Sequence, residues 1–335
     1  VSHISVILYK NKDMRLVIIG LMMLFVVSCK QTPNKIVTMQ EDVAVLASDE
    51  MGGRQTGTPG ELLAAAYITE RFSDIGLTPK GSEGNFTQTF SFTPSANPHE
   101  QSEFTNIQED GSVTGTNVIG YINNNAATTV IIGAHYDHLG MGGEGSLDRE
   151  KPAIHNGADD NASGIAILLA LADKLKNQSP TITQNNYLFM AFSGEEMGLL
   201  GSNYFVKTPT IDTKAVSYMI NMDMVGRLNK EQTLAVYGVG TSSLFKQTLF
   251  ANNNQGLTIK EHPSGVGPSD HTSFYLADIP VLHFFTGQHA DYHKPSDDPE
   301  KLNYGGMQQI SNYILNIVTD LDDAGQLAFK KTKNE

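Results

Sequence analysis

Beyond residue 37, the apolar positions of the chain alternate between two spacings. Leu62, Leu63, Tyr67, Ile68 and Phe72 recur at helical spacing, and the "TPG" just before them is a helix-start signal. Short runs rich in β-branched residues follow, among them "NVIGYI" and "TTVIIGAHYDH". The second run is nearly continuous in its apolar character, which is typical of a strand that is buried on both faces.

The same alternation continues to the end of the chain and predicts the fold class. Helices are predicted over 162–176, 197–207, 242–253 and 305–321, and strands over 185–196, 215–226, 233–238 and 279–285. Residues 82–115 are polar and predict edge strands and loop. This order predicts an α/β protein, a three-layer α/β/α sandwich around a mixed, largely parallel sheet. We expect one domain over 38–323 and a polar tail over 324–335.

The first residues carry a different signal. Residues 14–29 read "MRLVIIGLMMLFVVSC", with Arg15 ahead of an apolar run of 12 residues and Cys29 at its end. This is the layout of a secretory signal, and the run is shorter than the roughly 20 residues of a membrane span. "VVSC" resembles the lipobox of bacterial lipoproteins, which implies export and a lipid anchor on Cys29 in the cell envelope, in the periplasm or at the outer membrane. A plain signal peptide or a buried segment is the alternative.

Two further expectations concern this end of the chain. Met14 reads as the true start, so that residues 1–13 lie upstream of it, and residues 30–37 read as a tether. Composition adds little beyond this, because 40% hydrophobic and 18% charged residues are ordinary for a globular protein. The net charge of −13 argues against nucleic acid as a partner, and the single cysteine excludes an intrachain disulfide.

Acids and histidines gather where predicted strands end. In open α/β sheets the reactive side chains lie beyond the carboxyl ends of the strands. The residues at such positions are His135, Asp137, Glu195, Glu196, Asp223 and His293. Asp159 and Asp160 stand just ahead of a predicted helix, where a helix cap is the simpler interpretation. Asp223 is harder to explain in this way, because a carboxylate inside an apolar strand is costly unless it is paired or binds a metal.

Together these residues predict a hydrolytic metal site. A catalytic zinc needs imidazole and carboxylate ligands with an open position for water, and a two-metal site needs two such half-sites. Glu195 and Glu196 are adjacent, and the side chains of neighbouring residues in an extended segment point in opposite directions. One carboxylate can therefore bind a metal while the other faces the water. An acidic turn is the alternative interpretation of this pair.

Six motifs carry a family resemblance, and the match as a whole runs from about residue 40, at "LASDEMGGRQTGTPGE", to 320. "GAHYDHLG", "NGADDNASG", "SGEEMGLLGS", "NMDMVGR", "SDHTSF" and "YHKPSDD" resemble, in the same order, the co-catalytic zinc aminopeptidases of the bacterial leucyl aminopeptidase type. That family also includes glutamate carboxypeptidases and glutaminyl cyclases. The resemblance implies a zinc-dependent exopeptidase, expected to be an aminopeptidase, with two Zn²⁺ per chain, peptide substrates and a monomeric state.

The resemblance also implies a role for each residue. His135 and Asp223 would bind one zinc, Glu196 and His293 the other, and Asp160 both, while Glu195 would act as general base and Asp137 would orient His135. Tyr292, Asp270 and His271 would lie at the substrate pocket. Two features limit the match. The segment between the first helix and "TNVIGY" is too short for an inserted protease-associated domain, and Lys294 stands where relatives often have Thr.

Other functions remain open at this point. A glutaminyl cyclase would use one zinc, held by Asp160, Glu196 and His293, although the absence of tryptophan argues against its usual pocket. A binding module of the same fold without metals is a second alternative, and manganese or cobalt would suit the same ligands. The sequence does not separate aminopeptidase from dipeptidase or carboxypeptidase, because these enzymes share the ligand set.

Overall fold

The computed structural model describes residues 37–94, 102–105, 111–143 and 145–333. These residues belong to the unit Val37–Glu335. The predicted leader, the tether over residues 30–36 and Cys29 lie outside the described residues, so these features stay predictions.

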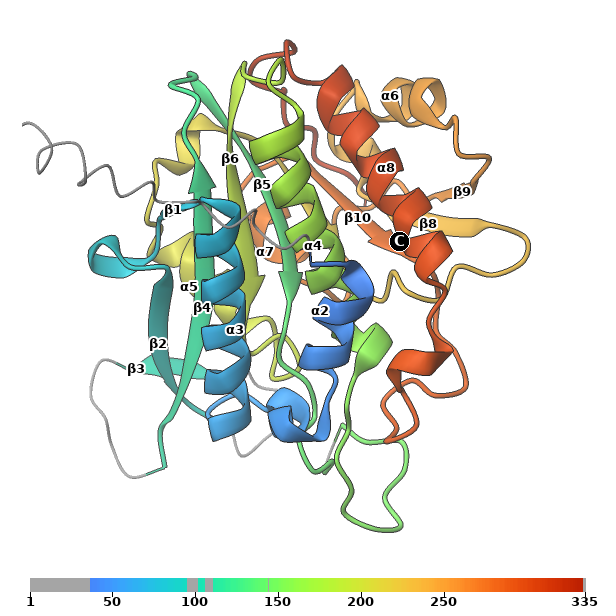
Figure 1. Ribbon diagram of the computed structural model, residues 1–335. Coiled ribbons are helices and arrows are strands. Elements are labelled where there is room, and N and C mark those ends of the chain that lie inside the picture. Colours follow the sequence, from blue (N-terminus) through green and yellow to red (C-terminus); the bar gives the residue numbers. More distant parts are fainter. Residues whose placement is uncertain (1–36, 95–101, 106–110, 144, 334–335) are drawn as a thin grey trace, which may run out of the picture. The chain divides into compact units, whose positions relative to one another are not determined.

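A ten-stranded sheet forms the centre of this unit (Figure 1). The strand order is β3-β2-β4-β6-β5-β7-β10-β8-β9, and β1 pairs with β4 off this path. The strands are β1 Thr78–Pro79, β2 Thr87–Thr93, β3 Glu103–Thr105, β4 Val113–Ile122, β5 Thr128–His135, β6 Asn185–Phe192, β7 Val216–Met222, β8 Thr233–Tyr237, β9 Thr258–Glu261 and β10 Val281–Phe285. The four central strands β6, β5, β7 and β10 run parallel, while β4 and β8 flank them antiparallel.

Helices cover both faces of the sheet. They are α2 Met39–Leu46, α3 Pro59–Ile75, α4 Gly164–Asp173, α5 Leu200–Lys207, α6 Phe245–Asn252, α7 His271–Tyr275 and α8 Tyr304–Asp320. Shorter helical turns are Asp49–Arg54, Ser82–Gly84, Ala158–Ser163, Lys174–Gln178, Thr213–Ala215, Val239–Thr241 and Pro299–Lys301. In Figure 1, α2, α3, α4 and α8 lie in front of the sheet and α7 lies behind it.

Two separate apolar cores show that the sheet is the middle layer. Side chains of α2, α3, α4, α6 and α8 pack against one face, and those of α5 and α7 pack against the other. Neighbouring residues of β5 divide between the two cores, Ile132 in the first and Ile131 in the second. This alternation is what a strand buried on both faces requires. The predicted α/β/α sandwich is therefore confirmed, with the parallel part of the mixed sheet at its centre.

Local signals account for where α3 begins and ends. The Thr58 side chain accepts a hydrogen bond from the Glu61 amide, and Pro59 occupies the first helical position. Gly76 ends the helix in the left-handed conformation, with φ of 86°, which only glycine adopts at low cost. The "TPG" start signal and the helical spacing thus predicted this element.

Four parts of the fold differ from the prediction. Strand β4 begins at Val113, inside the stretch expected to be edge strands and loop, and β9 and α7 were not predicted. The segment expected to be a polar tail packs against the domain, because Leu327 is buried and Phe329 contacts the core around α7. Leu327 belongs to the core that includes α8, so this segment contributes to the cores on both faces of the sheet.

The packed C-terminal segment yields a prediction for stability. Leu327→Ala should lower the free energy of unfolding by about 2–5 kcal/mol, because the side chain is 4% exposed and its removal leaves a cavity. Leu62→Ala is the matched control, since Leu62 is 58% exposed and its loss should change stability by less than about 0.5 kcal/mol. Urea unfolding of both variants measures the difference. Equal unfolding midpoints would show that the segment does not contribute to the core.

Candidate active site

The parallel strands bring the predicted site residues to one edge of the sheet. β5 ends at His135, β6 ends three residues before Glu195, and β7 ends one residue before Asp223. The loop after β10 carries His293, and Asp160 lies in the helical turn that precedes α4. Two groups of side chains converge there, His135 with Asp160 and Asp223, and His138 with Asp160 and Glu196. In each group the candidate ligand atoms lie within 4.8 Å of one another.

The first half of the site is built around His135. Its Nε2 lies 3.3 Å from Asp160 Oδ1 and 3.4 Å from Asp223 Oδ1. Its Nδ1 lies 3.2 Å from the main-chain oxygen of Asp137. Because a carbonyl oxygen can only accept a hydrogen bond, Nδ1 carries the hydrogen and donates it. In the neutral ring the Nε2 lone pair therefore faces two carboxylates, an arrangement that calls for a cation between them.

The second half repeats this arrangement around His293. The Nε2 atom lies 3.2 Å from Asp160 Oδ2 and 3.4 Å from Glu196 Oε2, and Nδ1 lies 2.9 Å from the main-chain oxygen of Gly145. The two oxygens of Asp160 thus face different histidines. A carboxylate in this position has one oxygen available to each half of the site.

The donor set fits zinc in its chemistry and its spacing. Two ligands that are each about 2.1 Å from a tetrahedral zinc ion lie roughly 3.4 Å apart. The four imidazole–carboxylate separations in the two halves are 3.2–3.4 Å. Histidines that donate Nδ1–H to a fixed acceptor and present Nε2 are the usual zinc-binding form.

The electrostatics of the site also favour positive charge. Burial alone would lower the pKa of His135, but the carboxylates of Asp223 and Glu195 outweigh burial and raise the pKa well above its usual value. Burial likewise opposes protonation of His293, yet Asp160 and Glu196 raise its pKa to about 9. The site therefore attracts a proton, or a metal ion, at both imidazoles.

Asp137 contacts His135 through its main-chain oxygen, and its carboxylate has further partners. Its carboxylate Oδ1 lies 3.6 Å from His135 Nδ1, which is too long for a hydrogen bond, and its main-chain oxygen takes that contact instead. The carboxylate accepts the amides of Glu195 at 3.1 Å and Glu196 at 3.4 Å, together with the Thr56 hydroxyl at 3.1 Å. Asp137 thus fixes the backbone of the glutamate pair as well as the orientation of His135.

The glutamate pair lies in a turn that a glycine makes possible. Gly194 has φ of 72°, in the left-handed region, and leads directly into Glu195. Glu196 lies between two imidazoles, with Oε1 2.7 Å from His138 Nδ1 and Oε2 3.4 Å from His293 Nε2. The Glu195 side chain makes no such contact among the described residues. Desolvation, only partly offset by His135, raises the pKa of Glu195 well above the usual range.

A buried carboxylate anchors the segment that carries Asp160. Asp297 Oδ2 accepts the amides of Asp159 at 2.9 Å and of Asp160 at 3.0 Å. Because Asp297 lies four residues after His293, one loop supplies both a candidate ligand and this anchor. Asp159 does not cap a helix but accepts from the Gly226 amide at 2.6 Å and contacts His289 at 3.1 Å.

Arg54 was not predicted as part of the site, although it lies inside the motif "LASDEMGGRQTGTPGE". Its guanidinium is fully buried and donates to the main-chain oxygens of Leu46, Tyr136, Asn156 and Gly157. Burial lowers its pKa to about 10, against the attraction of Asp160 and neighbouring carboxylates. Arg54 thereby ties together the segments that follow β5 and precede Asp160. A sequence motif can mark such a residue but cannot reveal main-chain acceptors.

The three candidate substrate residues lie in two different settings. Tyr292 is half-buried and stacks on His293, with ring centroids 3.8 Å apart. Asp270 and His271 are fully buried, and burial raises the pKa of Asp270 to about 7 and lowers that of His271 well below its usual value. Contact of these three residues with a substrate stays a prediction, and the burial of the last two favours support of the site from within.

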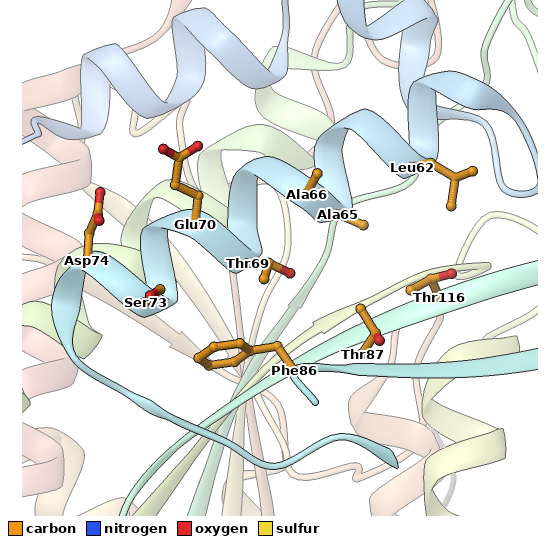
Figure 2. Close-up of a pocket in the computed structure, with 10 residues that line it drawn as sticks. All are labelled: Leu62, Ala65, Ala66, Thr69, Glu70, Ser73, Asp74, Phe86, Thr87 and Thr116. Atoms are coloured by element: carbon orange, nitrogen blue, oxygen red, sulfur yellow. The ribbon is translucent and has the colours of Figure 1, made fainter. Parts of the chain in front are cut away.

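A groove of about 590 Å³ lies elsewhere on the domain (Figure 2). It runs along α3, with Phe86, Thr87 and Thr116 opposite the helix. The predicted site residues, all of which the structure describes, are absent from its lining. The groove is therefore separate from the candidate site.

Curated proteins and solved structures resemble the chain over most of this domain. The alkaline phosphatase isozyme conversion protein of Escherichia coli is 30% identical over 69% of the chain and 66% of its own length. A probable leucine aminopeptidase of Arthroderma otae is 28% identical over 63% of the chain and 58% of its own length. The chain thus spans about three-fifths to two-thirds of these relatives.

Solved structures show the same fold at low identity. A zinc aminopeptidase from Bacillus subtilis matches with a TM-score of 0.64 and 18% identity, over 91% of this chain and 98% of its own. A glutaminyl cyclase from Bacteroides thetaiotaomicron matches with a TM-score of 0.66 and 15% identity, over 84% of this chain and 97% of its own. Matches at these sequence identities support the fold alone, so the activity is argued from the residues of the site.

The family itself is decided by the sequence profile that matches the core of the domain. The profile described as peptidase family M28 matches residues 117–318, which is more than half of the chain. The matched range includes all the residues that converge at the edge of the sheet. The chain therefore belongs to peptidase family M28, as its motifs predicted.

Proposed function

We propose that the protein is a zinc-dependent aminopeptidase with two zinc ions per chain. The observation that carries this proposal is Asp160, whose two oxygens face the Nε2 atoms of His135 and His293 at 3.3 and 3.2 Å. Asp223 completes one half of the site and Glu196 the other. Family membership and relatives named as leucine aminopeptidases support the same activity.

The chain's own residues divide the work of peptide hydrolysis. Zinc ions held by these ligands would lower the pKa of the attacking water and polarise the scissile carbonyl. Glu195 accepts a proton from the water and delivers it to the leaving amine. The Asp137 carboxylate holds the amides of Glu195 and Glu196, so that both glutamates keep a fixed backbone while only one carboxylate contacts histidines.

The pKa of Glu195 is compatible with this role. The value is raised because the carboxyl group is desolvated beside other acids. Positive ions bound to those acids would bring the pKa down toward the working pH, where a general base is most effective. Tyr292, whose ring stacks on His293, is proposed to donate its hydroxyl to a substrate oxygen.

The structure bears differently on the two alternative functions. A glutaminyl cyclase would need only Asp160, Glu196 and His293, and would leave His135 and Asp223 without a common ion. The close approach of His135 to both Asp160 and Asp223 favours the dinuclear peptidase. The lone pairs of two imidazoles face carboxylates, and this arrangement favours a bound cation over a binding module without metals.

The location of the protein is proposed from the sequence alone. The "VVSC" run that ends in Cys29 supports export and attachment to the cell envelope through a lipid on that cysteine. Among the described residues, no helix combines the length and the apolar character that crossing a bilayer requires. We expect a monomer that acts on peptides outside the cytoplasm.

Glu195→Gln and Glu196→Gln separate the roles of the two glutamates. Glu195→Gln should lower kcat about 10²–10⁴-fold and leave the zinc content unchanged, because only the proton acceptor is lost. Glu196→Gln should instead weaken zinc binding, because a charged ligand becomes neutral. Hydrolysis of aminoacyl chromogenic substrates and metal analysis of the purified variants measure both effects. Full activity in Glu195→Gln would contradict the assignment of the general base.

The number of zinc ions distinguishes the peptidase from the cyclase. The loaded wild-type protein should carry two zinc ions per chain, and a chelator should abolish hydrolysis of aminoacyl substrates until zinc is returned. Asp223→Asn should reduce the content to one ion. One ion in the wild type, together with release of ammonia from a glutaminyl peptide, would favour the cyclase.

Cys29→Ser tests the proposed anchor. In a bacterial host fed with labelled fatty acid, the wild-type protein should incorporate label and sediment with membranes, because the cysteine thiol is the acceptor for the lipid. The variant should be unlabelled and remain in the soluble fraction. Equal labelling of the two proteins would show that Cys29 is not the lipidated residue.

A further inference from the structure

His138 lies beside the candidate metal site and has no part in the proposed chemistry so far. Its side chain is fully buried, and its Nδ1 lies 2.7 Å from Glu196 Oε1 and 4.0 Å from Asp160 Oδ2. The residue follows β5 in the same loop as His135 and Asp137. Because His138 lies close to Asp160 and Glu196, these three residues could together bind a metal ion. Two roles are therefore open to it, that of a further ligand and that of a partner of Glu196.

The distances separate these two roles. The four contacts assigned to common zinc ions measure 3.2–3.4 Å, whereas His138 Nδ1 and Glu196 Oε1 are only 2.7 Å apart. Two ligands about 2.1 Å from zinc and this close would enclose an angle of roughly 80° at the ion, far from tetrahedral. The 2.7 Å separation is instead that of a charge-assisted N–H···O⁻ hydrogen bond.

We infer that His138 is a positioning residue, which donates Nδ1–H to Glu196 Oε1 and turns Oε2 of the same carboxylate toward His293. The inference rests on the proposed role of Glu196 as a zinc ligand. Glu196 is then fixed at three points: its amide binds the Asp137 carboxylate, Oε1 binds His138, and Oε2 faces the second half of the site. A glutamate has several rotatable bonds, so such fixing lowers the entropy lost when a metal binds.

The surroundings of His138 suit this role, because its ring has little freedom to move. A Cβ atom at Gly157 would lie 2.6 Å from the ring, so the ring packs directly against the backbone three residues before Asp160. The centroid of the His138 ring lies 5.8 Å from that of His293 and 6.4 Å from that of His155. A partner that is itself immobile can hold the carboxylate in one orientation.

The test compares three substitutions in the full-length, zinc-loaded protein. His138→Phe keeps the ring and removes the donor, whereas His138→Asn can place an amide N–H where Nδ1 stands. His155→Phe is the matched control, because His155 is equally buried in the same loop but contacts Ser146 and the main-chain oxygen of Ala153. Zinc affinity is measured by competition with a chromogenic chelator, and thermal unfolding of the metal-free proteins reports whether each variant folds.

If His138 positions Glu196, the three variants should differ in their zinc affinity. His138→Phe should weaken one of the two zinc equivalents about 10–100-fold, the usual effect of losing a partner of a metal ligand. His138→Asn should stay within a few-fold of the wild type, and His155→Phe should leave both equivalents unchanged. If His138→Phe does not fold, His138→Leu takes its place with the same expectation.

Other patterns would overturn the inference. Unchanged affinity in His138→Phe would show that Glu196 needs no such partner. Equal losses in His138→Phe and His138→Asn would make His138 a ligand, and an equal loss in His155→Phe would assign the effect to damage of the loop. A wild-type protein with a single zinc would contradict the dinuclear proposal alone, because the His138 variants still report on the remaining ion. A wild type that binds no zinc would overturn both.

Discussion

The structure depends on how it offsets the negative charge of several carboxylates that lie together at one edge of the sheet. Asp160, Glu196 and Asp223 converge on His135 and His293. Asp159 and Asp297 are bonded to the same segment. Carboxylates that are removed from water and brought together repel one another unless cations or hydrogen bonds offset their charge. Backbone amides donate to one or both oxygens of Asp137, Asp159 and Asp297, whereas the oxygens that face the imidazoles are left to a positive ion.

The fold makes this concentration possible because its central strands are parallel. Their carboxyl ends meet at one edge, so side chains that are far apart in the sequence lie within a few ångströms of one another. The loops that carry them are then fixed from behind. Arg54 binds main-chain oxygens on both sides of the site, and Asp297 joins the His293 loop to the Asp160 segment. The site is thus held by main-chain contacts on several sides.

Much of this could be predicted from the sequence, because strand runs and the residues after them obey simple rules. The rules place His135, Asp223 and Glu196 at strand ends, and β5 reads as buried from its apolar run alone. They fail where a contact involves the main chain or a neighbour in space. The preference of His135 for the Asp137 carbonyl, the pairing of His138 with Glu196, and the packing of Leu327 have no pattern in the sequence.

The central claim is that Asp160 bridges two zinc ions. The most direct measurement is X-ray diffraction from zinc-loaded crystals at wavelengths on either side of the zinc absorption edge. The account predicts two anomalous peaks about 3.5–4 Å apart, one between His135 and Asp223 and the other between Glu196 and His293, each next to a different oxygen of Asp160. A single peak, or a peak bonded to His138 Nδ1, would contradict it.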